Sequence, residues 1–176
     1  MNPPRLKRRP AQRTALMDFN SHLLPPAEGR PAPELVGIGG AYAPRAGIGS
    51  YSVHIEGKPE LNTTEVISSV DEGSVLLTGI VHTCHNLLPE EDLTIFLTDL
   101  EALDDLDDRN TWKWRNRNPK WHEETSPQYR ALMLRVVRER THRRLMFVAD
   151  DGNRTKYATF LAEYELRKAL IERDNA

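Results

Sequence analysis

The apolar positions after residue 34 first follow the period of β-strands. Leu35–Tyr42 is a short apolar run, and a Pro/Gly-rich turn at Ala43–Gly49 separates it from Ser50–Ile55, where apolar and polar residues alternate. This order predicts a β-hairpin. A second turn leads to Thr63–Val70, whose β-branched residues favour a strand. We therefore expect a meander of three strands at the start of the folded region.

The apolar period changes to that of helices after residue 74. Val75–Leu88 carries apolar residues at helical spacing, and Pro89 is expected to end that helix. Leu93–Leu97 has the composition of a buried strand, and Asp99 lies just beyond its end. The later expected elements are a short acidic helix, a helix capped by Thr125 or Ser126, a fifth strand and an amphipathic helix. Their ranges are Leu100–Asp108, Gln128–Thr141, Leu145–Ala149 and Thr155–Arg173. A meander followed by alternating helices and strands predicts a mixed sheet of the α/β (α+β) class.

Composition supports one folded domain with a tail. The chain has 176 residues, of which 39% are hydrophobic and 28% charged, enough for a single core. Residues 1–34 are predicted to be a Pro-rich basic N-terminal tail, and residues 35–176 a single domain. The basic cluster in the tail is typical of a solvated leader, and alternatively of an arm for nuclear targeting or nucleic-acid contact.

Charge and cysteine content narrow the class of protein. A net charge of −2 excludes a polycation, and the single cysteine excludes an internal disulfide. No apolar stretch approaches the roughly 20 residues of a membrane span. We therefore expect an intracellular protein, cytoplasmic or nuclear, with no membrane partner.

Several short motifs occur in an order that identifies a known architecture. Four segments carry it: Ile38–Ala41, Pro44–Gly49, Ser50–Val53 and Ile95–Asp99. Together with the order of elements, they resemble the ribonuclease H family from residue 35 to about residue 172. The resemblance implies a ribonuclease H-like fold, a five-stranded mixed sheet with strand order 3-2-1-4-5 flanked by helices.

The resemblance also implies a reaction, for which most of the required ligands are missing. The family hydrolyses the RNA strand of RNA–DNA hybrids with two Mg²⁺ ions held by four carboxylates. Carried onto this sequence, only the third carboxylate is retained, as Asp99. The other three fall on Gly39 (or Gly40 with a one-residue slip), Leu76 (or Val75) and Thr159. Because Mg²⁺ requires oxygen ligands, the resemblance implies a degenerate site that holds no cofactor.

Other acidic residues leave a second interpretation open. Asp150 and Asp151 precede the final helix, and with Asp99 they are the candidate ligands for one Mg²⁺ or Mn²⁺ ion. Asp71 and Glu72 lie just before the first helix. The alternative function is therefore an active metal-dependent ribonuclease H with a rearranged carboxylate site.

Basic and aromatic residues are interleaved before the long C-terminal helices. The candidates for nucleic-acid binding are Trp112, Lys113, Trp114, Arg115, Arg117, Lys120 and Trp121. Cations neutralise phosphates, and indoles stack on bases or sugars. A compatible interpretation is that some indoles belong to the core and that the basic residues surround them.

Charge is segregated in the C-terminal half. The segment 99–108 holds six acidic residues, and Arg130–Arg144 holds six arginines, whose default interpretation is a solvated helix face. The acidic block would repel a phosphate backbone near Asp99. It could instead face these arginines, within the chain or in a partner. This favours a protein partner, keeps RNA or an RNA–DNA hybrid as a second partner, and leaves self-association open.

The leading interpretation is a catalytically degenerate ribonuclease H-like domain, a pseudoenzyme that acts as a protein- and/or nucleic-acid-binding structural module. A retroelement or a domesticated copy is the source that the resemblance implies. A third interpretation is an unrelated α+β interaction domain. A structure that lacks three antiparallel strands leading into an alternating α/β half would establish the third.

Overall fold

The computed structural model describes residues 31–89, 91–107, 115–150 and 152–175. Its centre is a five-stranded mixed sheet of order β3-β2-β1-β4-β5. The strands are β1 (Glu34–Ala43), β2 (Ile48–Ile55), β3 (Thr63–Ser68), β4 (Leu93–Leu97) and β5 (Leu145–Ala149). The first three strands pair antiparallel, whereas β4 is parallel to β1 and to β5. The expected mixed sheet and its strand order are thus confirmed, and the structure has the three antiparallel strands whose absence would have established the third interpretation.

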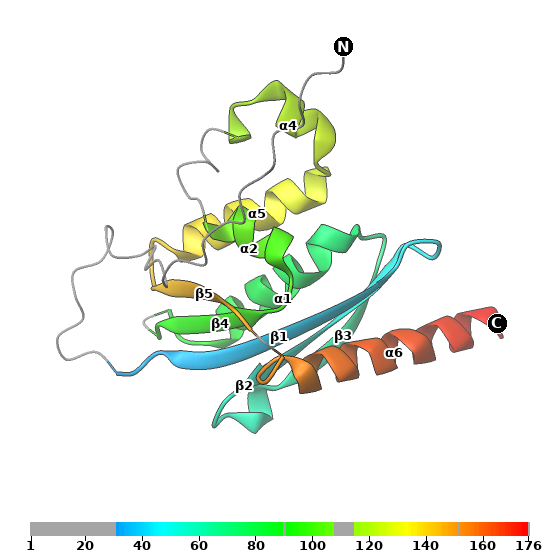
Figure 1. The fold of residues 1–176 in the computed structure, drawn as a ribbon, viewed down its shortest axis with the longest axis horizontal. Coiled ribbons are helices and arrows are strands. Elements are labelled where there is room, and N and C mark those ends of the chain that lie inside the picture. Colours follow the sequence, from blue (N-terminus) through cyan, green and yellow to red (C-terminus); the bar gives the residue numbers. More distant parts are fainter. Residues whose placement is uncertain (1–30, 90, 108–114, 151, 176) are drawn as a thin grey trace, which may run out of the picture.

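Helices cover the two faces of this sheet unequally (Figure 1). On one face lie α1 (Glu72–Asn86), α2 (Leu100–Asp107), α4 (Pro119–Glu124) and α5 (Pro127–Glu139). On the other face, α6 (Lys156–Asp174) lies alone across β1, β2 and β3. A 3₁₀ turn, η1 (Pro59–Leu61), connects β2 to β3. No helix in the described ranges is long and apolar enough to cross a membrane.

Side-chain caps set the starts of the helices. The Asp71 carboxylate accepts the N–H of Ser74 at 2.9 Å, which starts α1 three residues earlier than the apolar period predicts. Ser126 is the cap of α5, since its Oγ accepts the N–H of Tyr129 at 3.0 Å. Helix α4 was not expected, because Pro119 disfavours a helix interior. Pro119 instead occupies the first turn, where a missing N–H costs nothing.

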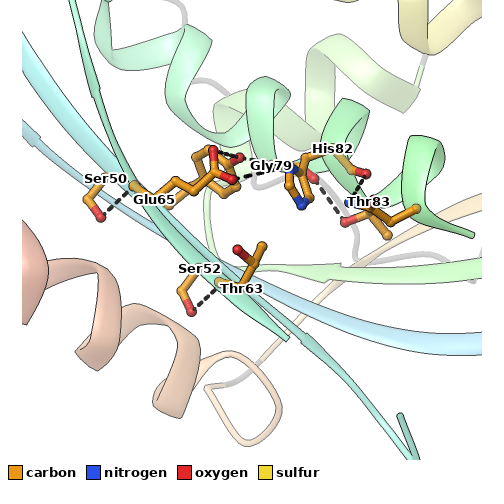
Figure 2. Close-up of polar contacts among 9 residues, drawn as sticks. Ser50, Ser52, Thr63, Glu65, Gly79, His82 and Thr83 are labelled. Atoms are coloured by element: carbon orange, nitrogen blue, oxygen red, sulfur yellow. Dashed lines mark hydrogen bonds and ion pairs between the residues drawn. The ribbon is translucent and has the colours of Figure 1, made fainter. Parts of the chain in front are cut away.

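The core fills the space between the sheet and α1. Its buried side chains include Val36, Ile38 and Tyr51 from the sheet, and Leu77 and Ile80 from the helix. Tyr51 also makes polar contacts with Glu65 of β3 and His82 of α1, two residues that Figure 2 labels. Its hydroxyl donates to Glu65 Oε2 at 2.7 Å and lies 3.1 Å from His82 Nδ1. Burial first, and then the hydrogen bond to Glu65 and its charge, raise the pKa of Tyr51. Strand β3, β2 and α1 are thereby held together.

The α6 side of the sheet is made of small side chains. The register pairs Gly39 with Ser52 and Ala41 with Ser50, so these residues share a face. The hydroxyls of Ser50 and Ser52 donate to carbonyls of β3 (Figure 2), so they lie buried without unsatisfied groups. This face is flat enough for a helix backbone to approach the strand closely.

Two glycines of β1 permit that approach. A Cβ on Gly39 would lie 2.2 Å from the backbone N of Thr159, and one on Gly37 would lie 2.5 Å from the carbonyl O of Arg154. Real Cβ atoms do not approach backbone atoms so closely. Any side chain at either position would therefore displace the start of α6 from the sheet.

Gly39→Ala is expected to lower the free energy of unfolding by about 3 kcal/mol or more, because the new methyl group meets backbone that cannot rotate away. Gly40→Ala is the matched control. Its Cβ would meet only the side chains of Leu76 and Val75, at 3.0–3.4 Å, which can shift. Urea unfolding of both variants measures the difference, and equal losses would contradict the close approach of α6.

Candidate functional site

The structure places Gly40, rather than Gly39, beside Leu76. A Cβ on Gly40 would lie 3.0 Å from Leu76 Cδ2 and 3.3 Å from Val75 Cγ1, on the α1 side of the sheet. Gly39 points to the opposite side, against Thr159. Successive residues of a strand face opposite sides, so positions 39 and 76 cannot contribute to one centre. The one-residue slip is thus the alignment that brings two of the replaced positions together.

Asp99 lies just beyond the end of β4, the strand that runs parallel to β1. The parallel register pairs Gly37 with Phe96, and Asp99 follows three residues after Phe96 and directly precedes α2. Asp99 Oδ1 accepts the N–H of Ala102 at 3.0 Å, and its carbonyl accepts the N–H of Leu103. The carboxylate that the sequence retains therefore begins α2 as a helix cap.

Asp150 likewise accepts hydrogen bonds from the residues at the start of α6. Its Oδ2 accepts the N–H of Arg154 at 3.0 Å and both the N–H and the hydroxyl of Thr155 at 2.8 Å. Burial raises the pKa of Asp150, but these hydrogen bonds together with one from Gly152 outweigh it, and the pKa lies below its ordinary value. The second candidate ligand, Asp151, lies outside the described residues.

Asp71 joins the starts of two helices. Besides capping α1, its Oδ2 accepts a hydrogen bond from the hydroxyl of Ser126, the cap of α5. Each of the three carboxylates at this edge is thus bound to N–H or O–H donors of a helix start. Among the described residues, no three His, Cys, Asp or Glu side chains are grouped so that they could hold a metal ion. The residues that the structure describes do not fit the family's two-ion site.

The acidic block contacts a candidate nucleic-acid-binding residue within the chain. Asp105 accepts hydrogen bonds from the Arg115 guanidinium and from the Tyr129 hydroxyl. Burial is the main cause that raises the pKa of Tyr129 to about 12; Arg115 opposes it, and Asp99 and Asp71 add to it. Sequence reasoning missed this link. Only the tertiary contact reveals it, because 10 and 24 residues separate the partners.

The other basic and aromatic candidates divide into three groups. Trp112, Lys113 and Trp114 lie outside the described residues. Trp121 is partly buried and packs against the core, as one of the sequence interpretations expected. Arg117 and Lys120 are exposed, and Lys120 lines an open cavity of about 440 Å³ with Arg115 and Trp121. The described part of the segment thus offers two exposed cations next to an acid-bound arginine.

The default interpretation of a solvated arginine face holds within α5 for Arg135 and Arg138, which are exposed, but not for two arginines that follow the helix and are buried. Arg143 is 1% exposed, and its Nη2 donates to the carbonyls of Cys84 and Leu87 at the end of α1. Arg140 is 3% exposed, donates to the carbonyl of Leu106 and lies 5.0 Å above the Phe147 ring. A cation at the C-terminal end of a helix stabilises its exposed carbonyls. These two arginines therefore hold α1, α2 and β5 together.

Asp150→Asn is expected to lower the free energy of unfolding at pH 7 by about 1–2 kcal/mol, because a neutral amide accepts weaker hydrogen bonds. The folded pKa of Asp150 is lowered from its ordinary value. The contribution of the carboxylate is therefore fully present above the unfolded pKa and is lost as the pH falls through the folded pKa. Urea unfolding at decreasing pH should show the difference between the two proteins narrowing. A difference that stays constant with pH would argue against this assignment.

Gly40→Asp combined with Leu76→Glu is expected to create Mn²⁺ binding measurable by calorimetry, because it places two carboxylates side by side on the α1 side of the sheet. Gly40→Asn with Leu76→Gln is the matched control and should bind no Mn²⁺. Circular dichroism verifies folding of both. A folded double-acid variant without Mn²⁺ binding would contradict the placement of Gly40 beside Leu76.

The fold is similar to that of a ribonuclease H1, LC11-RNase H1, whose crystal structure was solved in complex with an RNA/DNA hybrid. The TM-score is 0.59 and the sequence identity 11%, over 78% of this chain and 99% of that one. No protein-family model and no curated protein matches the sequence. A likeness at this identity concerns the fold alone. The chain therefore has a ribonuclease H-like α/β fold.

Proposed function

We propose that this chain is a catalytically degenerate ribonuclease H-like domain that acts as a binding module and does not cleave nucleic acid. The observation that carries the proposal is the contact between Gly40 and Leu76. At the two positions where the family's mechanism needs carboxylates, Gly40 has only a hydrogen atom and Leu76 has an isobutyl group. An apolar pair offers no ligand to Mg²⁺, which requires oxygen donors in nearly octahedral arrangement.

The remaining carboxylates support the same conclusion. Asp99, Asp71 and Asp150 each accept hydrogen bonds from a helix start, where a negative charge is favourable. A metal ion would have to compete with these donors. The acidic residues therefore contribute to the fold at the edge of the sheet where the related enzymes would perform catalysis.

A protein is the first partner in this proposal, and RNA or an RNA–DNA hybrid is the second. Arg117 and Lys120 are exposed and able to contact phosphates, but Asp105 compensates the charge of the neighbouring Arg115. Phosphate contact at this surface is thus expected to be weak and sensitive to salt. A retroelement origin is part of the proposal only through the resemblance of the sequence.

One observation favours the alternative, an active ribonuclease with rearranged ligands. Asp99 and Asp150 follow β4 and β5, whose last residues, Leu97 and Ala149, pair directly. The two acids therefore lie at the same edge of the sheet. Their engagement as helix caps makes this the weaker of the two functions.

The purified protein is expected to leave a labelled RNA–DNA hybrid intact with either Mg²⁺ or Mn²⁺, because the Gly40 and Leu76 positions supply no ligand. Gel electrophoresis of the products measures cleavage, and Asp99→Asn is assayed beside the wild type. Cleavage that Asp99→Asn abolishes would overturn the proposal in favour of the active enzyme. Cleavage that survives the substitution identifies a contaminating nuclease and is removed by further purification.

The same samples report binding of the uncleaved hybrid by gel shift. Arg117→Ala with Lys120→Ala should weaken any shift, whereas Arg45→Ala with Lys156→Ala, which removes two exposed cations elsewhere, should not. A shift that both pairs weaken equally reflects nonspecific charge. Such a result would remove nucleic acid from the proposal and leave the protein partner.

A further inference from the structure

Helix α6 presents a stripe of large apolar side chains to solvent. Tyr157, Phe160, Tyr164 and Ile171 are 58%, 60%, 55% and 62% exposed. Their spacing of three, four and seven residues places them along one side of the helix, at the a and d positions of a heptad. A helix that packs only on a sheet requires a single apolar face, so this second stripe is not explained by the fold.

Most of the stripe lies opposite the side that holds α6 on the sheet, and Tyr157 at its N-terminal end also lies edge-on to His54 of β2, with ring centroids 6.0 Å apart. The buried side is formed by Ala158, Ala162 and Leu166, which are half a turn away from the exposed residues. In Figure 1 the sheet lies on one side of α6, and the helix forms the outer layer of the fold on the other. Three aromatic residues and an isoleucine on an open helix side are typical of an interaction surface.

The charges beside the stripe on one copy of the helix are complementary to those on a second copy. Tyr157 and Tyr164 begin two successive heptads. Glu163 occupies position g of the first, and Lys168 occupies position e of the second. When two such helices pack in parallel, position g of one faces position e of the next heptad in the other. Glu163 of each copy would therefore face Lys168 of the other. A two-fold axis produces this pairing twice, so the surface fits a second copy of the same chain.

Arg167 occupies the remaining seam position, between Tyr164 and Ile171. Glu163 lies 3.8 Å from its guanidinium on the same helix and partly compensates its charge. A single polar residue within a seam specifies the number of helices at a cost in stability. The seam therefore favours a pair of helices and an association of moderate strength.

We propose that this chain forms a two-fold symmetric dimer through the outer sides of two parallel α6 helices. The contact surface consists of Tyr157, Phe160, Tyr164 and Ile171, with Glu163 and Lys168 at its edges. Each sheet lies on the far side of its own α6, so the two domains do not collide. The edge with Gly40 and Asp99 stays open, and the dimer is independent of the function proposed above.

Sedimentation of the full chain over a range of micromolar concentrations tests the dimer. The wild type is expected to sediment as a dimer that dissociates on dilution, and Phe160→Asp with Tyr164→Asp as a monomer. Leu88→Asp is the matched control, because Leu88 is 61% exposed at a site away from α6. A wild type that is monomeric throughout would overturn the proposal, as would a dimer that survives the double substitution.

Charge reversal tests the parallel arrangement and does not depend on the aromatic variants folding. Glu163→Lys alone and Lys168→Glu alone should each weaken the dimer about tenfold, because each creates two repulsive pairs. A mixture of the two variants should recover association as a heterodimer, since every g position then faces an opposite charge. Single variants that associate like the wild type, or a mixture that fails to recover, would refute the parallel dimer. Arg167→Leu should tighten it.

Discussion

Direct contact between the backbones of β1 and α6 determines how the rest of the molecule is arranged. Because Gly37 and Gly39 have no side chains, none separates the backbone of β1 from that of α6. Helix α6 therefore lies directly on β1 and also covers β2 and β3. The apolar side chains of β1 then point the other way and form the core with α1. The same contact means that position 39 cannot carry a carboxylate without displacing α6.

Helix starts determine what the acidic residues do in this fold. Asp71 and Asp99 come immediately before a helix, and Asp150 accepts from the residues that lead into α6 although it lies several residues earlier. Each accepts hydrogen bonds from N–H groups that would otherwise lack partners. A carboxylate in such a position stabilises the protein whether or not it ever binds a cation. The acids at this edge thus have a structural role in the fold that does not depend on a metal ion.

Local periodicity explains why the sheet could be predicted and much of the site could not. The ranges of β4 and β5 were predicted to the residue, because short apolar runs bounded by polar turns determine them. The choice between Gly39 and Gly40 could not be made from sequence, since a shift of one residue reverses the side of a strand. Only the positions of Leu76 and Thr159 in space distinguish them.

Which charged residues are buried could not be predicted from the sequence either, because their burial depends on contacts with distant elements. Arg140 and Arg143 look like their exposed neighbours in α5, and only the ends of α1 and α2 distinguish them. The contact of Asp105 with Arg115 and Tyr129 likewise joins residues from three segments. Such contacts depend on the packing of whole elements, whereas strands and helices depend mainly on their own residues.

The small side chains between α6 and the sheet have a consequence for how the molecule opens. Ala158 and Ala162 rest on glycine and serine, whereas α1 buries valine, leucine and isoleucine. Lifting α6 away therefore exposes far less apolar surface to water than lifting α1 would. The serine hydroxyls, already bonded to β3, would stay satisfied. The C-terminal helix is thus the element most readily detached in a partial unfolding event, with the remainder of the sheet and its core left closed.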